Sequence, residues 1–455
     1  IWHTYPDGRD PRSYHGNYPE SRESRPWMEM SIRAIPNSNK YVAVSAPHHG
    51  ENYGSLVIID LNKEDDRSTS QVYRLTPEVL FPESEIRPGV AHKKGKHDPK
   101  AEVYGSPWPI SEEFYLTVYD TDQKKYGIYL LDCFGNKVLL YEDEEFACLD
   151  PIPLKKRKKP VNIPIQTTQA KADKKGEDTG KGNVIVLNVY DSELPWPEGT
   201  KITDLRIVQV FPKTTRIADD PFIGVGAQSL ARGVIGTVPV EEDGSANFTV
   251  PTGIPIYFQA LDSLGRAVQT MRSVTYLHEG ETLTCIGCHD KKYQPASFTG
   301  MASAAIKRKP SVPVNDFQNS YPLLFPKLVQ PVLDKKCMNC HNSNEKAPSL
   351  RGDRYGEHGW SEAYHTLAPL SWAKHGGNGG LIKKNNNISY SIPGEVGALD
   401  SKLYKMLKEG HHDVKLSDEE MKTLILWLDC NSVFYGSYEN PGVQAKGIVV
   451  QPWLY

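Results

Sequence analysis

The 455-residue sequence contains no apolar run approaching the roughly 18–20 residues that a membrane-spanning helix needs. Its formal net charge of −3 gives no reason to expect nucleic acid or an anionic membrane as a partner. The chain starts at Ile1 with neither methionine nor a signal peptide, which predicts a processed product or a fragment. With 38% hydrophobic and 24% charged residues, the composition is that of a soluble globular protein of several domains.

Cysteine is scarce outside two short motifs. Four of the seven cysteines lie in C-x-x-C-H sequences, which leaves Cys133, Cys148 and Cys430. Because three leftover cysteines cannot all pair within one chain, the sequence argues against a disulfide framework. Haem c is attached outside the cytoplasm, so cysteines that form thioethers to haem predict an exported protein.

The two motifs are typical of haem c attachment, in which two thiols hold the macrocycle and the next histidine ligates its iron. The motif residues are Cys285, Cys288 and His289, then Cys337, Cys340 and His341. One four-cysteine zinc site is the alternative, but its cysteine pairs usually lie roughly 15–20 residues apart. Here 48 residues lie between Cys288 and Cys337, so the spacing favours two haems c.

The second haem needs a sixth ligand opposite the expected proximal ligand, His341. The downstream candidates are His358, His365, His375, Met406, His411 and His412. We prefer His411, with His412 as the close alternative, because "KEGHHDVKLS" places this pair in a loop just before a capped helix. A solvated histidine pair is the other interpretation. Bis-histidine ligation would leave no open position and predicts electron transfer.

Tyr293 makes the first motif ambiguous, because it follows His289 by four residues. If Tyr293 ligated the iron, the phenolate would stabilise the ferric state and the opposite face could stay open for a small substrate. The freed His289 could then bind zinc. Spacing alone favours a surface tyrosine, since the chain contains 24 tyrosines.

The region 1–154 reads as β-structure. Residues 40–61 predict two strands, and residues 126–143 predict a hairpin around Phe134-Gly135-Asn136. Such hairpins resemble propeller blades, and too few are present for a closed ring, so we expect the C-terminal blades of a β-propeller. The run "KKRKK" then opens a polar linker over 155–182. A nuclear or nucleic-acid signal is disfavoured there, because acidic residues follow and no aromatic residues are interleaved.

The rest of the chain changes character near residue 312. Short strands separated by turn signals over 183–280 predict an antiparallel sandwich or barrel-like module that leads directly into the first haem motif. Together they form an expected β-rich middle domain over 183–311. Residues 312–455 predict an α-helical cytochrome c-like domain. Its clearest helix is 417–430, with a capping box of Ser417 and Glu420. The expected fold class is therefore multidomain and mainly β, with a partial β-propeller, a β-rich haem c domain and a C-terminal helical haem c domain.

Several segments resemble the hydrazine synthase alpha subunit of anammox bacteria and its planctomycete relatives. The segment 236–273, followed by "HEGETLTCIGCH", is similar to its middle domain. "DGRDPRSYHGNYPE" with "APHHGENYGSLVIIDL" resembles the end of its propeller. "PVLDKKCMNCH" and "GHHDVKLSDEEMKTLILWLDCN" resemble its C-terminal haem domain. The resemblance implies that Tyr293 ligates the first iron while His289 binds zinc, and that His341 and His411 ligate the second iron.

The resemblance also implies an enzyme that condenses ammonia with hydroxylamine to hydrazine at the middle-domain haem. Beta- and gamma-type subunits and a further haem subunit would be partners, and the anammoxosome lumen would be the location. The candidates for a distal base or further zinc ligands are residues of the expected propeller, His15, His48, His49 and Asp60, and a structural role is the commoner outcome for such residues. A dihaem electron-transfer protein without catalysis is the main alternative, and a propeller scaffold with incidental haems is a third.

Overall fold

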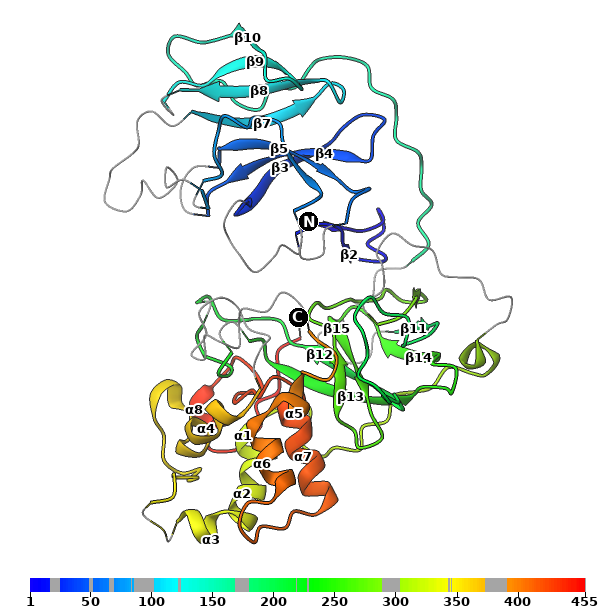
Figure 1. Cartoon of the computed structure of the whole chain (residues 1–455), viewed down its shortest axis with the longest axis vertical. Coiled ribbons are helices and arrows are strands. Elements are labelled where there is room, and N and C mark those ends of the chain that lie inside the picture. The colour runs from blue at the N-terminus through cyan, green and yellow to red at the C-terminus, as the bar shows by residue number, and fades with distance from the viewer. Residues whose placement is uncertain are drawn as a thin grey trace. The chain divides into compact units, whose positions relative to one another are not determined.

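The structure is a computed structural model. It describes residues 1–16, 25–48, 52–64, 69–82, 84–85, 102–121, 124–167, 180–217, 219–226, 229–288, 303–342, 344, 346–372 and 391–454. The chain forms two compact units (Figure 1): unit 1 comprises 1–2 and 13–162, and unit 2 comprises 3–12 and 163–455. The four-part division at 154, 182 and 311 stays a prediction.

Unit 1 contains two four-stranded antiparallel sheets, each a simple meander. The first sheet consists of β3 (Met28–Ala34), β4 (Lys40–Ala46), β5 (Ser55–Asp60) and β6 (Val72–Arg74). The second consists of β7 (Val103–Pro109), β8 (Phe114–Asp120), β9 (Gly127–Asp132) and β10 (Lys137–Tyr141). Two short strands, β1 (Trp2–His3) and β2 (Arg12–Ser13), pair near the start of the chain. In the described residues the sheets close into neither a barrel nor a propeller.

Both hairpins expected in unit 1 are confirmed. Strands β4 and β5 pair from Lys40–Asp60 to Ser45–Ser55. At the second hairpin, one carboxylate oxygen of Asp132 accepts hydrogen bonds from the backbone N–H groups of Phe134 and Asn136, each at 2.9 Å. The Asp132 side chain therefore stabilises the turn in which Gly135 has φ +92°.

The β-rich part of unit 2 is a pair of sheets around one core. One sheet has the order β14-β11-β17 and the other β13-β12-β15-β16. The strands are β11 (Lys181–Val186), β12 (Asp204–Val210), β13 (Arg232–Pro239), β14 (Ala246–Pro251), β15 (Ile256–Leu261), β16 (Ala267–Thr270) and β17 (Thr282–Cys285). Val184, Phe248 and Leu283 from the first sheet share a buried cluster with Ile207 and Phe258 from the second.

The strands expected over 183–280 pair antiparallel, as predicted. One further strand differs, because β17 pairs in parallel with β11, from Asn183–Thr282 to Val186–Cys285. A parallel neighbour requires a long connection, and here that connection contains the whole second sheet. The strand that carries the first haem motif is therefore held by a partner about one hundred residues earlier in the chain.

The helices of unit 2 follow the β-rich part. They are α1 (Phe325–Leu328), α2 (Gln330–Lys336), α3 (Met338–His341), α4 (Glu362–Leu367), α5 (Gly397–Asp400), α6 (Lys402–Glu409), α7 (Asp418–Asp429) and α8 (Pro441–Gln444). Single 3₁₀ turns lie at Ala304–Lys307, Glu357–Gly359 and Ala368–Leu370. The expected capping box of α7 is confirmed, since Glu420 N–H donates to the Ser417 hydroxyl and Ser417 N–H donates to the Glu420 carboxylate.

A buried ion pair joins α7 to the second β-sheet of unit 2. One guanidinium nitrogen of Arg206 lies 2.9 Å from an Asp429 carboxylate oxygen, and both side chains are fully buried. Asp429 also accepts hydrogen bonds from the backbone N–H groups of Ala267 and Ala398, each at 2.9 Å. A buried charge is tolerated only with such partners, so this pair fixes the helical part on the β-rich part.

Candidate functional site

The second C-x-x-C-H motif is built on a turn of helix. Cys337 closes α2, and the N–H groups of Cys340 and His341 donate to its carbonyl oxygen at 3.2 and 3.0 Å. Residues three and four positions apart lie on one side of a helix. The fold therefore presents the two thiols and the imidazole toward one another, as haem c attachment requires. Cys337 packs against the hydrophobic core, whereas Cys340 is exposed.

The orientation of the His341 ring is fixed by the backbone. Its Nδ1 lies 2.7 Å from the Pro348 carbonyl oxygen, which can only accept a hydrogen bond. Nδ1 therefore carries the proton, and Nε2 keeps its lone pair for a metal. Metal-binding histidines commonly use this arrangement, because the outer hydrogen bond sets both the tautomer and the ring direction.

The His411 ring lies beside the His341 ring, at a separation that suits one metal ion between two imidazoles. The two ring centroids are 6.2 Å apart and the ring planes differ by 35°. A metal bound by two opposed imidazoles holds their centroids about 6 Å apart, since each metal–nitrogen bond is about 2.0–2.1 Å. His412 makes an edge-on contact with His411, at 4.7 Å between centroids. Ligation of the second iron by His411 stays a prediction, and this ring separation is compatible with it.

The loop that carries His411 has an unusual backbone. Gly410 ends α6 with φ +104°, and His412 has φ +50°, a conformation that costs energy for a residue with a side chain. The N–H of Val414 donates to the His411 carbonyl oxygen at 3.2 Å and closes the turn. Partial burial, with His412 and His341 nearby, lowers the pKa of His411, a direction that favours the neutral form in which an imidazole binds a metal.

The other candidate ligands for this haem that the structure describes have contacts of their own. The His358 ring packs on Phe222 and Trp360, with centroids 4.1 and 4.9 Å away. His365 Nε2 lies 3.1 Å from the Glu357 carbonyl oxygen. Met406 packs against the hydrophobic core of unit 2. His375 lies outside the described residues.

The first motif begins at the end of a strand, whereas the second lies on a helix. Strand β17 ends at Cys285, and the N–H groups of Leu187 and Asn188 continue its ladder by donating to Cys285 and Ile286 carbonyl oxygens at 2.9 and 3.0 Å. Cys285 and Cys288 pack partly buried against the core between the two β-sheets of unit 2. A Cβ atom on Gly287 would overlap the carbonyl oxygen of Asp191, so only glycine fits between the two cysteines.

The remaining residues of this site cannot be placed. His289 and Tyr293 lie outside the described residues, so ligation of the first iron by Tyr293 and of zinc by His289 stay predictions. In the described ranges, no group of three or more His, Cys, Asp or Glu side chains has a metal-binding arrangement.

The candidates for a distal base or further zinc ligands that the structure describes have structural contacts in unit 1. His15 is buried, with Nδ1 at 2.6 Å from the Gln71 side-chain oxygen and Nε2 at 3.5 Å from Glu29. Asp60 accepts the backbone N–H of Asn62 at 3.0 Å in a turn. The His48 ring stacks on Trp27 at 5.9 Å. His49 lies outside the described residues.

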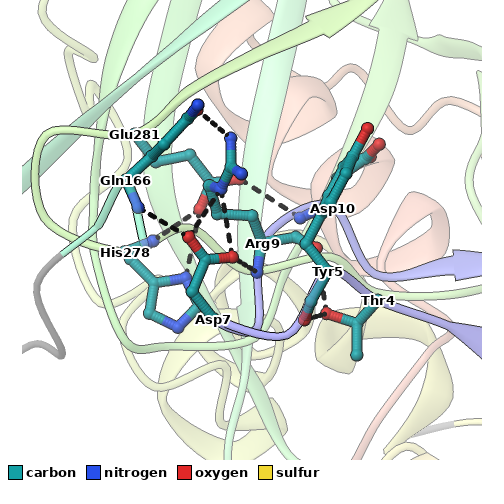
Figure 2. Close-up of polar contacts among 8 residues, drawn as sticks. All are labelled: Thr4, Tyr5, Asp7, Arg9, Asp10, Gln166, His278 and Glu281. Carbon is teal, nitrogen blue, oxygen red and sulfur yellow. Dashed lines mark hydrogen bonds and ion pairs between the residues drawn. The ribbon is translucent and has the colours of Figure 1, made fainter. Parts of the chain in front are cut away.

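A polar cluster at the start of β17 was not predicted (Figure 2). His278 and Glu281 are both buried, and Glu281 accepts hydrogen bonds from His278 N–H at 2.9 Å and Asp10 N–H at 3.2 Å. Asp7 accepts from Gln166 N–H at 2.9 Å and Arg9 Nε at 2.8 Å, and these bonds lower its pKa. The cluster binds residues 4–10 to the base of the strand that carries Cys285.

Sequence signals for this cluster were weak. His278 and Glu281 are only three residues apart, but their partners Asp7, Asp10 and Gln166 come from distant segments. Gly8 offers a hint, since it has φ +83° and a Cβ atom there would lie 3.0 Å from the His278 ring. Only the fold shows that the N-terminal segment packs on this histidine.

Known proteins with a similar sequence carry the same middle region. Residues 161–290 match the family model described as the hydrazine synthase alpha subunit middle domain, a range that includes Cys285, Cys288 and His289. The hydrazine synthase subunit alpha of Kuenenia stuttgartiensis is 23% identical over 435 residues, covering 72% of this chain and 53% of the relative. The chain is similar to the hydrazine synthase alpha subunit. The resemblance stated from the sequence is thereby confirmed.

The solved structure of Kuenenia stuttgartiensis hydrazine synthase shares the fold of this chain. The TM-score is 0.67 at 18% identity, with 96% of this chain and 65% of that chain covered. The chain thus spans about half the length of the curated alpha subunit it matches. No helix in the described ranges is both long and apolar enough to cross a membrane.

Proposed function

We propose that this chain is a dihaem c subunit of a hydrazine synthase-type enzyme. In the proposed reaction, ammonia attacks hydroxylamine at the middle-domain haem, an N–N bond forms, the N–O bond breaks, and hydrazine and water leave. The relationship of residues 161–290 to the alpha-subunit middle domain is the observation that supports this reaction most directly.

The residues of the first site have distinct proposed roles. Cys285 and Cys288 would bind the haem through thioethers, and Tyr293 would ligate the iron as an anionic oxygen donor. Bound there, the haem would supply a ferric centre with one face open to the nitrogen substrate. His289 would hold a zinc ion. Gly287 supports this proposal, because its close backbone contact with Asp191 fixes the spacing of the two thiols.

The second site is proposed to transfer electrons. Cys337 and Cys340 would attach the haem, with His341 and His411 as axial ligands. The 6.2 Å separation of these rings and the hydrogen bond from His341 Nδ1 to Pro348 support that ligand pair. This observation also favours the alternative function, a dihaem electron-transfer protein, if the first haem proves to have two protein ligands as well.

The assembly and the location are part of the same proposal. Beta- and gamma-type subunits and a further haem subunit would be partners, and the last of these would supply hydroxylamine. Export to a periplasm-like compartment, the anammoxosome lumen in an anammox bacterium, would follow from haem c attachment. The two sheets of unit 1 would be the C-terminal blades of a propeller, a role that their four-stranded meanders support.

Isotope labelling tests the proposed reaction. The full chain, purified with the subunits that assemble on it, is supplied with ¹⁵N-ammonium and unlabelled hydroxylamine. We expect mass spectrometry to detect hydrazine with one heavy nitrogen. In Tyr293→Phe the rate of hydrazine formation should fall on the order of a hundredfold or more, because removing one preorganised electrostatic group commonly costs a factor of this size. His412→Ala is the matched control and should keep the wild-type rate. Haem-replete protein that forms no mixed-label hydrazine would overturn the proposal.

A further inference from the structure

The segment 151–165 forms an exposed strap without helix or strand. Figure 1 shows it as a drawn-out trace after β10. Prolines at 151, 153, 160 and 164 favour an extended backbone, because each fixes its own φ and biases the preceding residue toward extended conformations. The strap is therefore prepared for binding as a strand and would lose little entropy on docking.

Aliphatic side chains on this strap are unusually exposed. Leu154 is fully exposed, Val161 is 82% exposed and Ile165 is 78% exposed. Val161, Ile163 and Ile165 alternate along the chain, so an extended backbone places all three on one face. A single exposed aliphatic residue needs no explanation, but an alternating row on a pre-extended segment is what strand-like peptide ligands present to a groove.

The backbone of the same residues has open hydrogen-bonding capacity. Within the described chain, the N–H and C=O groups of Val161, Ile163 and Ile165 make no hydrogen bond. In a strand these alternate residues direct their backbone groups to one edge, whereas 160, 162 and 164 serve the other edge. Pro160 and Pro164 have no N–H, so the second edge cannot form a complete ladder. The strap can add to one sheet edge only.

Charge defines the chemistry of the partner. Residues 151–172 include no acidic residue, and 155–159 are all basic. Arg157 stacks on Trp108, 4.5 Å from the ring centroid, and so anchors the run to unit 1. In the described structure Lys155, Lys156, Lys158 and Lys159 have no ion pair. These four ammonium groups are available to an acidic surface.

We propose that residues 151–165 are a docking strand that adds to an open sheet edge on an acidic protein partner. Val161, Ile163 and Ile165 fill apolar pockets, their backbone groups pair with the edge, and the lysines contact carboxylates beside it. A membrane surface is a poorer match, because the strap forms no amphipathic helix and its aliphatic side chains alternate as they do in a strand. Single-stranded nucleic acid is a poorer match too, because the strap has no aromatic side chain for base stacking.

Hydrogen–deuterium exchange on the full chain, free and in the complex copurified with its own subunits, tests the docking strand. We expect slower exchange at the amides of Val161, Ile163 and Ile165 in the complex, and unchanged exchange at Asn162. Benzoylphenylalanine at 161 should cross-link to a strand flanked by Asp or Glu in one subunit. Unchanged exchange, uniform protection of 161–165, or a cross-link to a surface without acidic residues would each overturn the proposal.

A matched pair of variants tests which edge is used. Ile163→Pro removes an N–H from the pairing edge, whereas Asn162→Pro removes one from the edge that is already blocked. We expect Ile163→Pro to weaken assembly on the order of tenfold or more, measured by analytical ultracentrifugation, and Asn162→Pro to leave it nearly unchanged. Ile163→Ala separates the lost side chain from the lost hydrogen bond. Equal effects of the two proline variants would contradict the assignment.

Charge reversal and competing probes complete the test. Replacing the four lysines by glutamate should weaken assembly at least tenfold at low salt, with a smaller effect at high salt. Binding of the full chain to phosphatidylglycerol vesicles or to a single-stranded 20-mer DNA, lost in the lysine variant while subunit assembly is kept, would overturn the protein-partner proposal. The haem spectrum should be unchanged in every variant, so failure here is distinguishable from failure of the proposed function.

Discussion

The two C-x-x-C-H motifs of this chain occupy opposite structural settings. Cys337, Cys340 and His341 lie on consecutive helical turns, where positions i, i+3 and i+4 share one side. Cys285 and Cys288 instead follow the end of a parallel β-strand, across a glycine that contacts another backbone. A shared sequence motif therefore does not fix a shared backbone setting for its two cysteines.

The difference has a chemical consequence. The helical motif has a second histidine, His411, whose ring centroid lies 6.2 Å from that of His341. If both ligate as proposed, both faces of an iron there would be occupied. The strand motif has Tyr293 close behind in sequence and carries the proposed open site. Two haems in one chain can thus serve different roles, one for electron transfer and one for substrate.

The buried ion pair between Arg206 and Asp429 joins the helical part of unit 2 to its β-rich part. Of the changes considered, breaking this pair should cause the largest loss of stability. Asp429→Ala leaves the Arg206 charge buried and unpaired, so we expect a loss of about 3–5 kcal/mol in unfolding free energy, measured by urea denaturation. Asp353→Ala, which removes an exposed partner of Arg351, is the matched control and should change little. Similar losses in both variants would contradict the role assigned to the buried pair.

Gly287→Ala should impair haem attachment at the first motif and leave the second motif unaffected. A methyl group there overlaps the Asp191 carbonyl oxygen, so the first attachment site must distort while the second is untouched. We expect the haem content, measured by the pyridine haemochrome assay, to fall from two per chain toward one. Gly280→Ala is the control, because a Cβ atom there has nothing within 4 Å, although its φ of +75° adds some strain. Two retained haems in Gly287→Ala would show that the close approach is not needed.

Removing His411 should open the second site. His411→Ala is expected to convert one low-spin haem to a form that binds carbon monoxide or added imidazole, whereas His412→Ala keeps the low-spin spectrum. The reason is that the His411 ring lies beside the His341 ring while His412 contacts only His411 in this cluster. Optical titration with imidazole measures the difference. If His412→Ala alone opened the haem, the ligand assignment would be reversed.

The smallest expected effect is a pH dependence near the helical motif. Lys335, Ser417 and Lys336 hold the pKa of Glu420 at about 2, below its ordinary value of 4.5, despite the opposing effect of burial. A depressed pKa stabilises the fold above pH 4.5, and this contribution is lost as the pH falls toward 2. Thermal unfolding should therefore show a shallower decline over that range in Glu420→Gln than in the wild type. Parallel curves would contradict this.

Local patterns predicted much of the fold. The hairpin at 126–143 and the capped helix at 417–430 are set by turn residues and periodicity within a few positions, and both are found. The parallel pairing of β17 with β11, the Arg206–Asp429 pair and the packing of residues 4–10 on His278 join segments far apart in sequence. No local signal specifies such contacts, because they depend on how whole sheets and helices pack.

In the candidate site too, local sequence patterns identify some residues, whereas other contacts are evident only from the structure. The cysteines and His341 were identified from spacing, and His411 from its place before a capped helix. The hydrogen bond from His341 to Pro348 and the overlap at Gly287 needed coordinates, since both involve a backbone carbonyl group whose direction sequence does not encode.

The central claim is that the two irons differ in their ligands, and a ferric optical and EPR spectrum with and without hydroxylamine tests it most directly. We expect one low-spin bis-histidine haem that hydroxylamine leaves unchanged. The other haem should show a phenolate-to-iron charge-transfer band that hydroxylamine shifts. Two bis-histidine signatures, both insensitive to hydroxylamine, would contradict the account and support a protein that only transfers electrons.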